Sequence, residues 1–145
     1  MINYYEKIIN AMANFVMDSY AMLAFFRNEE GAEKVSQLLH DAANEKSELY
    51  MTCINAGEVF YITYRKENAT KANVAWKALQ QFPIHIMQAD MEFTFAAAKL
   101  KARYSISYAD AFAAALTIKR KATLITGDKE FDALLGETGF KVKYL

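Results

Sequence analysis

Apolar and polar residues follow one another in blocks that predict strands alternating with helices. Short runs of strand-forming residues lie at 14–17, 49–54, 84–87 and 122–126, and an alternating segment at 140–144 reads as an edge strand. The segments between them have apolar positions at helical spacing. They predict helices at 19–26, 29–46, 55–66, 70–81, 91–103 and 108–120, and a short one at 131–135.

This alternation predicts an α/β fold. We expect a three-layer α/β/α sandwich around a central, mainly parallel five-stranded sheet. The length of 145 residues suits one domain, which we expect to occupy residues 14–145. Residues 1–13 precede the first strand and predict an N-terminal extension, either a short amphipathic helix or a loose segment.

The composition narrows the class of protein. A hydrophobic content of 54% argues against a disordered chain, and no apolar run reaches membrane-spanning length. Cys53 is the one cysteine, so an internal disulfide is impossible, which agrees with a cytoplasmic location. Basic and acidic residues number 17 each, so net charge does not favour nucleic acid unless the acids gather in one place.

Four acidic residues lie at similar places relative to the predicted strands. Asp18 follows the first strand and Asp128 follows the fourth, while Glu58 and Asp110 each fall in the first turn of a predicted helix. Ligands of open α/β sheets bind beyond the carboxyl ends of the strands. We therefore expect these four side chains to converge on one end of the sheet.

Each acid taken singly also has a structural explanation. Asp18 and Asp128 suit helix N-caps, and segments 55–58 and 107–110 have the spacing of a capping box. Four carboxylates brought together, however, repel one another unless a cation compensates. Ligands that are all oxygen favour Mg²⁺ or Mn²⁺ over zinc.

Such a metal centre predicts hydrolysis of phosphodiester bonds. A bound Mg²⁺ or Mn²⁺ lowers the pKa of a coordinated water and stabilises charge that develops on the phosphoryl group. Ribonucleases without a metal usually need histidine for acid–base work. His40 falls on a predicted helix and His85 inside a predicted strand, so we expect both to be structural.

The acids lie in segments that resemble the motifs of the PIN-domain family. The similar segments are residues 15–24, 54–59, 107–115 and 122–131, and the likeness extends over 14–145. Length and the Ala-rich helix around Asp110 are most similar to VapC-type toxins. The resemblance implies that Asp18, Glu58, Asp110 and Asp128 bind the metal. It also implies that the Thr126 hydroxyl assists by binding a carboxylate or a metal-bound water.

The resemblance further implies an activity and partners. VapC-type toxins are Mg²⁺- or Mn²⁺-dependent endoribonucleases that cut structured cellular RNA to a 5′-phosphate and a 3′-hydroxyl. They pair into homodimers and are silenced by a cognate antitoxin. A housekeeping PIN nuclease that processes RNA, and an inert PIN-like interaction domain, remain alternatives. A phospho-receiver or an Asp-x-Asp phosphatase fits poorly, because Asp18-Ser19-Tyr20 lacks a second acid.

A few further residues lie close to the predicted site. Asp90 follows the third strand, and we expect it to cap the next helix. Asp132, one helical turn after Asp128, either supplements the site or is simply solvated. Ser19 suits the first turn of a helix. Tyr20 and Tyr108 lie beside predicted ligands, where they either stack on nucleobases or pack against the protein.

Overall fold

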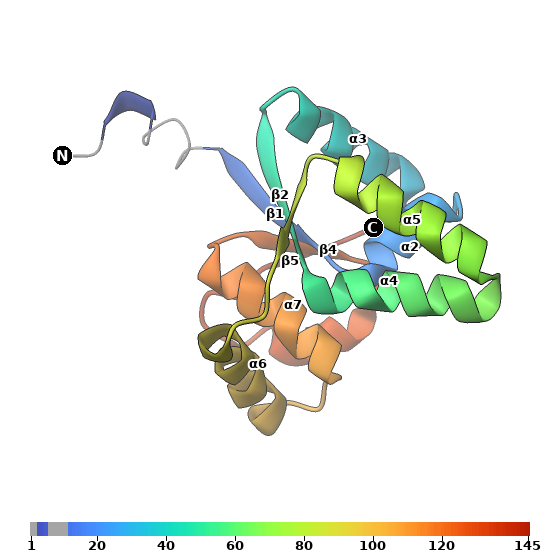
Figure 1. Ribbon diagram of the computed structural model, residues 1–145. Helices are drawn as coiled ribbons and strands as arrows, with labels where there is room; N and C mark the ends of the chain where they lie inside the picture. Colours follow the sequence, from blue (N-terminus) through green and yellow to red (C-terminus); the bar gives the residue numbers. More distant parts are fainter. Residues whose placement is uncertain (1–2, 6–11) are drawn as a thin grey trace.

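A single parallel sheet organises the protein. The computed structural model describes residues 3–5 and 12–145, and its helices cover both faces of the sheet (Figure 1). The strands are β1 (Ala13–Met17), β2 (Ser47–Thr52), β3 (Ile84–Met87), β4 (Thr123–Thr126) and β5 (Val142–Tyr144). They lie in the order β3-β2-β1-β4-β5, and all four pairings are parallel. The predicted fold class is confirmed, with a wholly rather than mainly parallel sheet.

Helices make every connection between consecutive strands, as parallel pairing requires. The connecting helices are α2 (Ser19–Phe26), α3 (Ala32–Ala43), α4 (Cys53–Lys66), α5 (Ala69–Gln81), α6 (Met91–Arg103), α7 (Tyr108–Lys119) and the 3₁₀ helix η1 (Lys129–Leu134). The expected short helix at 131–135 is this 3₁₀ turn, and it begins directly after Asp128. The expectation for residues 1–13 lies largely outside the described residues.

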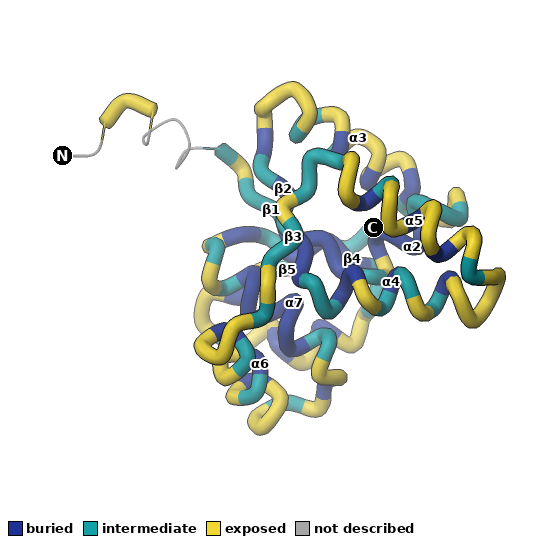
Figure 2. Tube along the Cα trace, in the orientation of Figure 1, coloured by how far each residue is buried: buried dark blue, intermediate teal, exposed yellow. Residues whose placement is uncertain are grey.

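Two hydrophobic cores hold the three layers together. One joins α2, α3, α4 and α5 to the face of the sheet that carries Met17 and Leu49, and the other joins α6, α7 and η1 to the face that carries Val16 and Leu124. Neighbouring residues of a strand point to opposite faces, so Val16 and Met17 enter different cores. Buried residues accordingly follow the middle of the sheet and α7 in Figure 2.

Helix α7 is buried along most of its length. Residues 111–117 are all buried, and five of them are alanine or another small residue that lets the helix approach the sheet closely. Contacts with α4, α6, β1, β2 and β4 surround it. The first turn of α7, which carries Asp110, is therefore fixed against the carboxyl end of the sheet.

The strand order reverses direction between β1 and β4. From β1 the chain builds outward through β2 to β3, and it then returns to place β4 on the other side of β1. Two loops that leave neighbouring parallel strands in opposite directions open a crevice, and this is where α/β sheets bind ligands. Asp18 follows β1 and Asp128 lies just beyond β4, so both border that crevice.

The start of α4 differs from the sequence prediction. We expected a strand at 49–54 and a helix from Asn55, but β2 ends at Thr52 and α4 begins at Cys53. The Thr52 side chain caps the helix by accepting from the Asn55 N–H at 2.9 Å. Asn55 is thus inside the helix rather than its cap, and Glu58 lies in the second turn.

Helix α3 is also shorter than predicted, because Gly31 adopts a left-handed backbone before it.

No helix among the described residues combines the length and the apolar character needed to cross a membrane.

Phe131 provides a test of how strongly η1 is anchored. Its side chain is fully buried and packs on Phe140, so Phe131→Ala should lower the free energy of unfolding by about 3–5 kcal/mol. Leu135→Ala is the matched control, because Leu135 is 60% exposed and should change stability by no more than about 0.5 kcal/mol. Urea unfolding of both variants measures the difference. Equal losses would contradict the packing described for this core.

Candidate functional site

Asp18 links β1 to β4 across the crevice. It is buried, with 3% of its surface exposed, and it caps α2 through Oδ1, which accepts from the Ala21 N–H at 2.9 Å. Its Oδ2 accepts from the Thr126 hydroxyl at 2.5 Å. Thr126 Oγ1 in turn accepts from the Asp128 N–H at 3.0 Å. The Thr126 hydroxyl therefore has a carboxylate partner, which is one of the two partners that we expected.

Burial makes Asp18 a weak acid in the folded protein. Loss of hydration raises its pKa from 3.8 to about 7, and the negative charges of Asp110 and Asp128 add to the rise. The hydrogen bonds from Thr126 and Ala21 act in the opposite direction but do not cancel the effect of burial. In the absence of a cation, Asp18 therefore holds its proton over much of the acidic pH range.

Asp110, Asp128 and Glu130 form the tightest acidic group among the described residues. One carboxylate oxygen from each lies within 4.8 Å of the other two. Asp110 comes from the first turn of α7 and Asp128 caps η1 through a 2.9 Å bond from the Glu130 N–H. Asp110 and Asp128 are predicted ligands, whereas Glu130 is not among the predicted site residues. Asp18 and Glu58 lie outside this close group.

The pKa of Asp110 rises to about 6. Loss of hydration is the largest cause, followed among the charges by Asp128, Glu58 and Glu130, while the Ser107 side chain opposes the rise through a hydrogen bond. Together with the charges that act on Asp18, these interactions connect all four predicted acids electrostatically. The structure thus places the four acids at one end of the sheet.

Glu58 is held by two side chains from different segments. Its Oε1 accepts from the Ser19 hydroxyl and from Asn55 Nδ2, each at 3.0 Å. Asn55 is fully buried, and its Oδ1 accepts from the Thr52 hydroxyl at 2.7 Å. Its Nδ2 also lies 3.5 Å from the Ala109 carbonyl oxygen at the start of α7. Asn55 therefore joins the Glu58 side of the site to the Asp110 side.

The capping-box reading of residues 55–58 is consequently wrong. Asn55 does not cap a helix with its side chain; it orients a predicted metal ligand. The Ser107–Asp110 capping is confirmed in part, because the Asp110 N–H donates to Ser107 Oγ at 3.0 Å. The expected caps at Asp18 and Asp128 are confirmed, and both residues also belong to the acidic group, so their role as metal ligands stays a prediction.

Gly127 allows the loop after β4 to pass very close to the Tyr20 ring. A Cβ placed on Gly127 would lie 2.1 Å from Cε1 of Tyr20 and 2.6 Å from its Cζ. Only a glycine lets the Tyr20 ring lie this close to the backbone between Thr126 and Asp128. The sequence Thr126-Gly127-Asp128 therefore combines a hydroxyl, a close contact and a carboxylate in three consecutive residues.

Asp90, Asp132 and the two histidines make structural contacts. Asp90 caps α6 through a 2.8 Å bond from the Phe93 N–H, as expected. Asp132 accepts from the Tyr144 hydroxyl, which ties η1 to β5. His40 contacts Asn44 on α3, and the His85 ring pairs with Glu48 at 2.7 Å.

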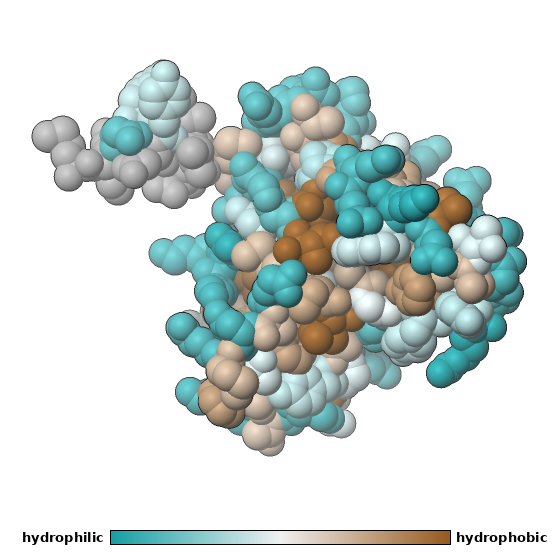
Figure 3. Space-filling view, viewed as in Figure 1, coloured by the Kyte–Doolittle hydropathy of each residue, from teal (hydrophilic) through white to brown (hydrophobic). Residues whose placement is uncertain are grey.

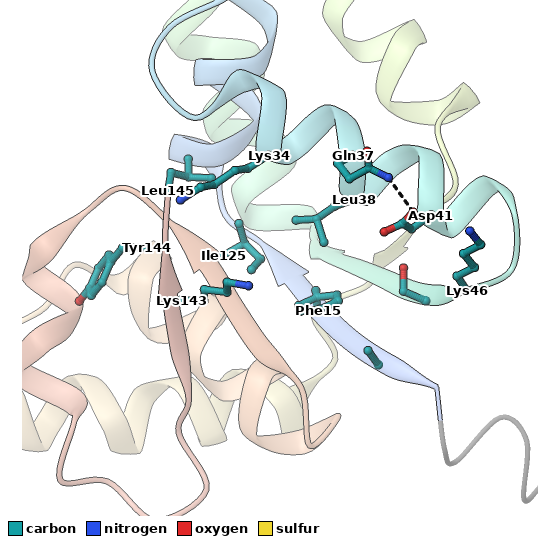
Figure 4. A pocket seen from close by; sticks show the side chains of 12 residues that line it. Phe15, Lys34, Gln37, Leu38, Asp41, Lys46, Ile125, Lys143, Tyr144 and Leu145 are labelled. Carbon is teal, nitrogen blue, oxygen red and sulfur yellow. Dashed lines mark hydrogen bonds between the residues drawn. The ribbon is translucent and has the colours of Figure 1, made fainter.

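A groove of about 410 Å³ lies away from the acids (Figure 4). Helix α3 and residues of β1, β4 and β5 enclose it, with Phe15, Leu38 and Ile125 among its lining side chains. None of the four predicted acids is among its lining residues in the described part of the chain. The chemistry of the protein is therefore better sought among the clustered acids than in this groove.

The family model of the PIN domain matches residues 15–135. The chain belongs to the PIN-domain family. The matched range contains β4, the last three residues of β1 and all four predicted acids. None of the curated proteins compared with it gives a match.

Solved structures of VapBC systems share the fold of this PIN domain. A chain of the DNA-bound VapBC complex of Salmonella typhimurium aligns with a TM-score of 0.70 at 12% identity, over 92% of this chain and 98% of its own. The sarcin–ricin-loop-cleaving toxin VapC20 of Mycobacterium tuberculosis gives 0.68 at 16% identity, over 85% and 95%. VapBC-1 of nontypeable Haemophilus influenzae gives 0.66 at 22% identity, over 90% and 97%.

The raised acid pKa values predict how the stability of the metal-free PIN domain depends on pH. Unfolded Asp18 loses its proton near 3.8, whereas folded Asp18 keeps it up to about 7. In that window the folded state binds more protons, so rising pH favours unfolding. We expect a loss on the order of a few kcal/mol between about pH 4 and pH 7, measured by urea unfolding in chelator.

Asp18→Asn supplies the matched variant for this measurement. Asparagine keeps an oxygen that can cap α2, but it does not titrate. The variant should therefore lose much less stability than the wild type across the same pH window, with Asp110 accounting for the remainder. A wild-type profile that is flat or rises over this range would show that Asp18 is ionised in the folded protein.

Proposed function

We propose that this PIN domain is a metal-dependent endoribonuclease that hydrolyses RNA phosphodiester bonds. The observation that carries the proposal is the convergence of Asp18, Glu58, Asp110 and Asp128 at the strand-order reversal, with family membership as independent support. A group of mutually repelling carboxylates weakens a fold unless it binds a cation. The group lies where open α/β sheets bind their ligands, beyond the carboxyl ends of the strands.

The donor set fits Mg²⁺ or Mn²⁺. Mg²⁺ binds oxygen at about 2.0–2.1 Å, so two oxygens on one ion lie up to roughly 4 Å apart. The oxygens of Asp110, Asp128 and Glu130 lie within 4.8 Å of one another, which a small side-chain adjustment converts to that spacing. We propose Asp18, Glu58, Asp110 and Asp128 as the metal ligands and Glu130 as a neighbour in reach. Soft ligands are absent from the described part of this site.

The bound metal would supply an activated water and stabilise the charge of the phosphoryl transition state. The protein's own residues prepare this site. Thr126 fixes one oxygen of Asp18, and Asn55 and Ser19 fix one oxygen of Glu58. Held in this way, the acids do not have to lose side-chain freedom when the cation and the RNA bind.

We further propose that the protein is the toxin of a type II toxin–antitoxin pair and acts in the cytoplasm, where its RNA substrate is. VapBC complexes with the same fold support an antitoxin partner. Homodimer formation is also part of the proposal. Apolar side chains gather on the face around β3 (Figure 3), an edge strand whose Ile84, Ile86 and Met87 are only partly buried. Such a patch suits a protein interface.

Asp110→Asn should abolish RNA cleavage. The change removes one negative ligand while the Ser107 cap of α7 remains; we expect activity to fall by at least roughly 100-fold, as is typical when a ligand of a catalytic metal or its support is lost. Purified protein is incubated with total cellular RNA and Mn²⁺, and new 5′-phosphate ends are mapped. A parallel reaction with a chelator should give no ends.

The control for this experiment is Asp90→Asn. Asp90 is an exposed acid at the N-cap of α6, and asparagine caps equally well, so cleavage should continue at the wild-type rate. Normal cleavage by Asp110→Asn would show that the site is wrongly assigned. New ends at one or a few positions support a toxin, whereas scattered ends support a housekeeping PIN nuclease. A folded wild-type protein that neither binds Mn²⁺ nor cuts RNA would be an inert PIN-like domain.

A further inference from the structure

Tyr20 is an exposed aromatic side chain at the border of the acidic site. It is the second residue of α2, and 48% of its surface is exposed. Its ring lies directly against Gly127, where an added Cβ would come within 2.1 Å of Cε1 and 2.7 Å of Cδ1. Gly127 lies between Thr126 and Asp128, so the ring is seated next to two residues of the site.

Two segments that are far apart in the sequence hold this ring in place. The backbone of α2 is fixed by the Asp18 cap, and the loop that carries Gly127 is fixed by the Thr126 and Asp128 hydrogen bonds. The ring is thus held on one side by backbone, while its exposed part is open to solvent. A rigid ring with an open surface loses little entropy when a flat partner stacks on it.

The charge of the protein increases the need for such a contact. Lys and Arg equal Asp and Glu at 17 each, and acids surround the proposed cleavage site. Close to these acids, attraction between basic residues and phosphates contributes less to RNA binding than it does at a basic surface. Stacking of bases on aromatic rings does not depend on net charge and suits single-stranded segments of RNA.

We propose that Tyr20 is a stacking platform for one base of a single-stranded RNA segment beside the cleaved bond. This inference rests on the proposed ribonuclease function and names the feature of the substrate that the site recognises. The base lies on the exposed part of the ring, and its phosphate is directed toward the carboxylates next to Gly127. Tyr20 acts as a binding residue, and any base can stack on it.

Binding of a single-stranded oligoribonucleotide of about 12 nucleotides tests the proposal. Ca²⁺, which also takes oxygen ligands, replaces Mn²⁺ in the binding reaction. Tyr20→Leu should raise the Kd by roughly 5- to 100-fold, the range for one stacked base. Tyr20→Phe, which keeps the ring, should bind within about twofold of wild type. Tyr64→Leu is the matched control, because Tyr64 is similarly exposed at 54% but lies near the far end of α4.

A double-mutant cycle separates stacking from a structural role. The oligoribonucleotide is made with one abasic nucleotide at each position in turn, and each is titrated against wild type and Tyr20→Leu. Stacking predicts one position at which the abasic change weakens wild-type binding but no longer weakens the variant. If Tyr20 only covers Gly127, the losses add at every position and the proposal fails. Equal Kd values for wild type and Tyr20→Leu also overturn it.

Failure of the stacking proposal can be told from failure of the ribonuclease proposal. If wild-type protein binds Mn²⁺ and cleaves RNA, but Tyr20→Leu leaves oligoribonucleotide binding unchanged, the stacking proposal fails and the ribonuclease proposal stands. If wild-type protein neither cleaves RNA nor binds the oligoribonucleotide, both proposals fail. Equal weakening by Tyr20→Leu and Tyr64→Leu would show that exposed tyrosines bind RNA without a specific site, which also overturns the proposal.

Discussion

The burial of closely spaced carboxylates is the constraint on which the site of this protein depends. The parallel sheet directs two neighbouring loops into one crevice, and acids from β1, β4, α4 and α7 border it. Burial makes the repulsion stronger, because a low-dielectric surrounding screens charges poorly. The fold tolerates this arrangement by giving each acid hydrogen-bond donors. The pKa values of Asp18 and Asp110 nevertheless stay raised, chiefly by desolvation and to a smaller degree by the neighbouring negative charges.

The same hydrogen bonds serve folding and the site. Asp18 caps α2 and accepts from Thr126, and Asp128 caps η1 while its N–H donates to Thr126. A helix cap and a place in the acidic site are therefore compatible for these residues. Helix N-termini stabilise negative charge, which is the reason that one carboxylate can fill both roles.

The sequence predicted the fold class, the order of the elements and the end of the sheet at which the acids meet. Periodicity and the position of acids after strands were sufficient, because a parallel sheet has only one carboxyl edge. The sequence did not predict the contribution of Asn55 or Glu130. Asn55 was assigned to a helix cap because the end of β2 was placed two residues too late, and Thr52 provides the cap instead. Glu130 joins Asp110 only through the three-dimensional path of η1, which no local pattern encodes.

The double duty of Asp18 also has an evolutionary consequence. A single base change converts an aspartate codon to asparagine, and asparagine is as good a helix cap as aspartate. Loss of the carboxylate therefore need not cost the chain its fold. Descendants that carry asparagine at position 18 can therefore keep an intact domain although the acidic site has lost one carboxylate. Because one residue serves both the fold and the acidic site, the fold can persist after the acidic site has changed.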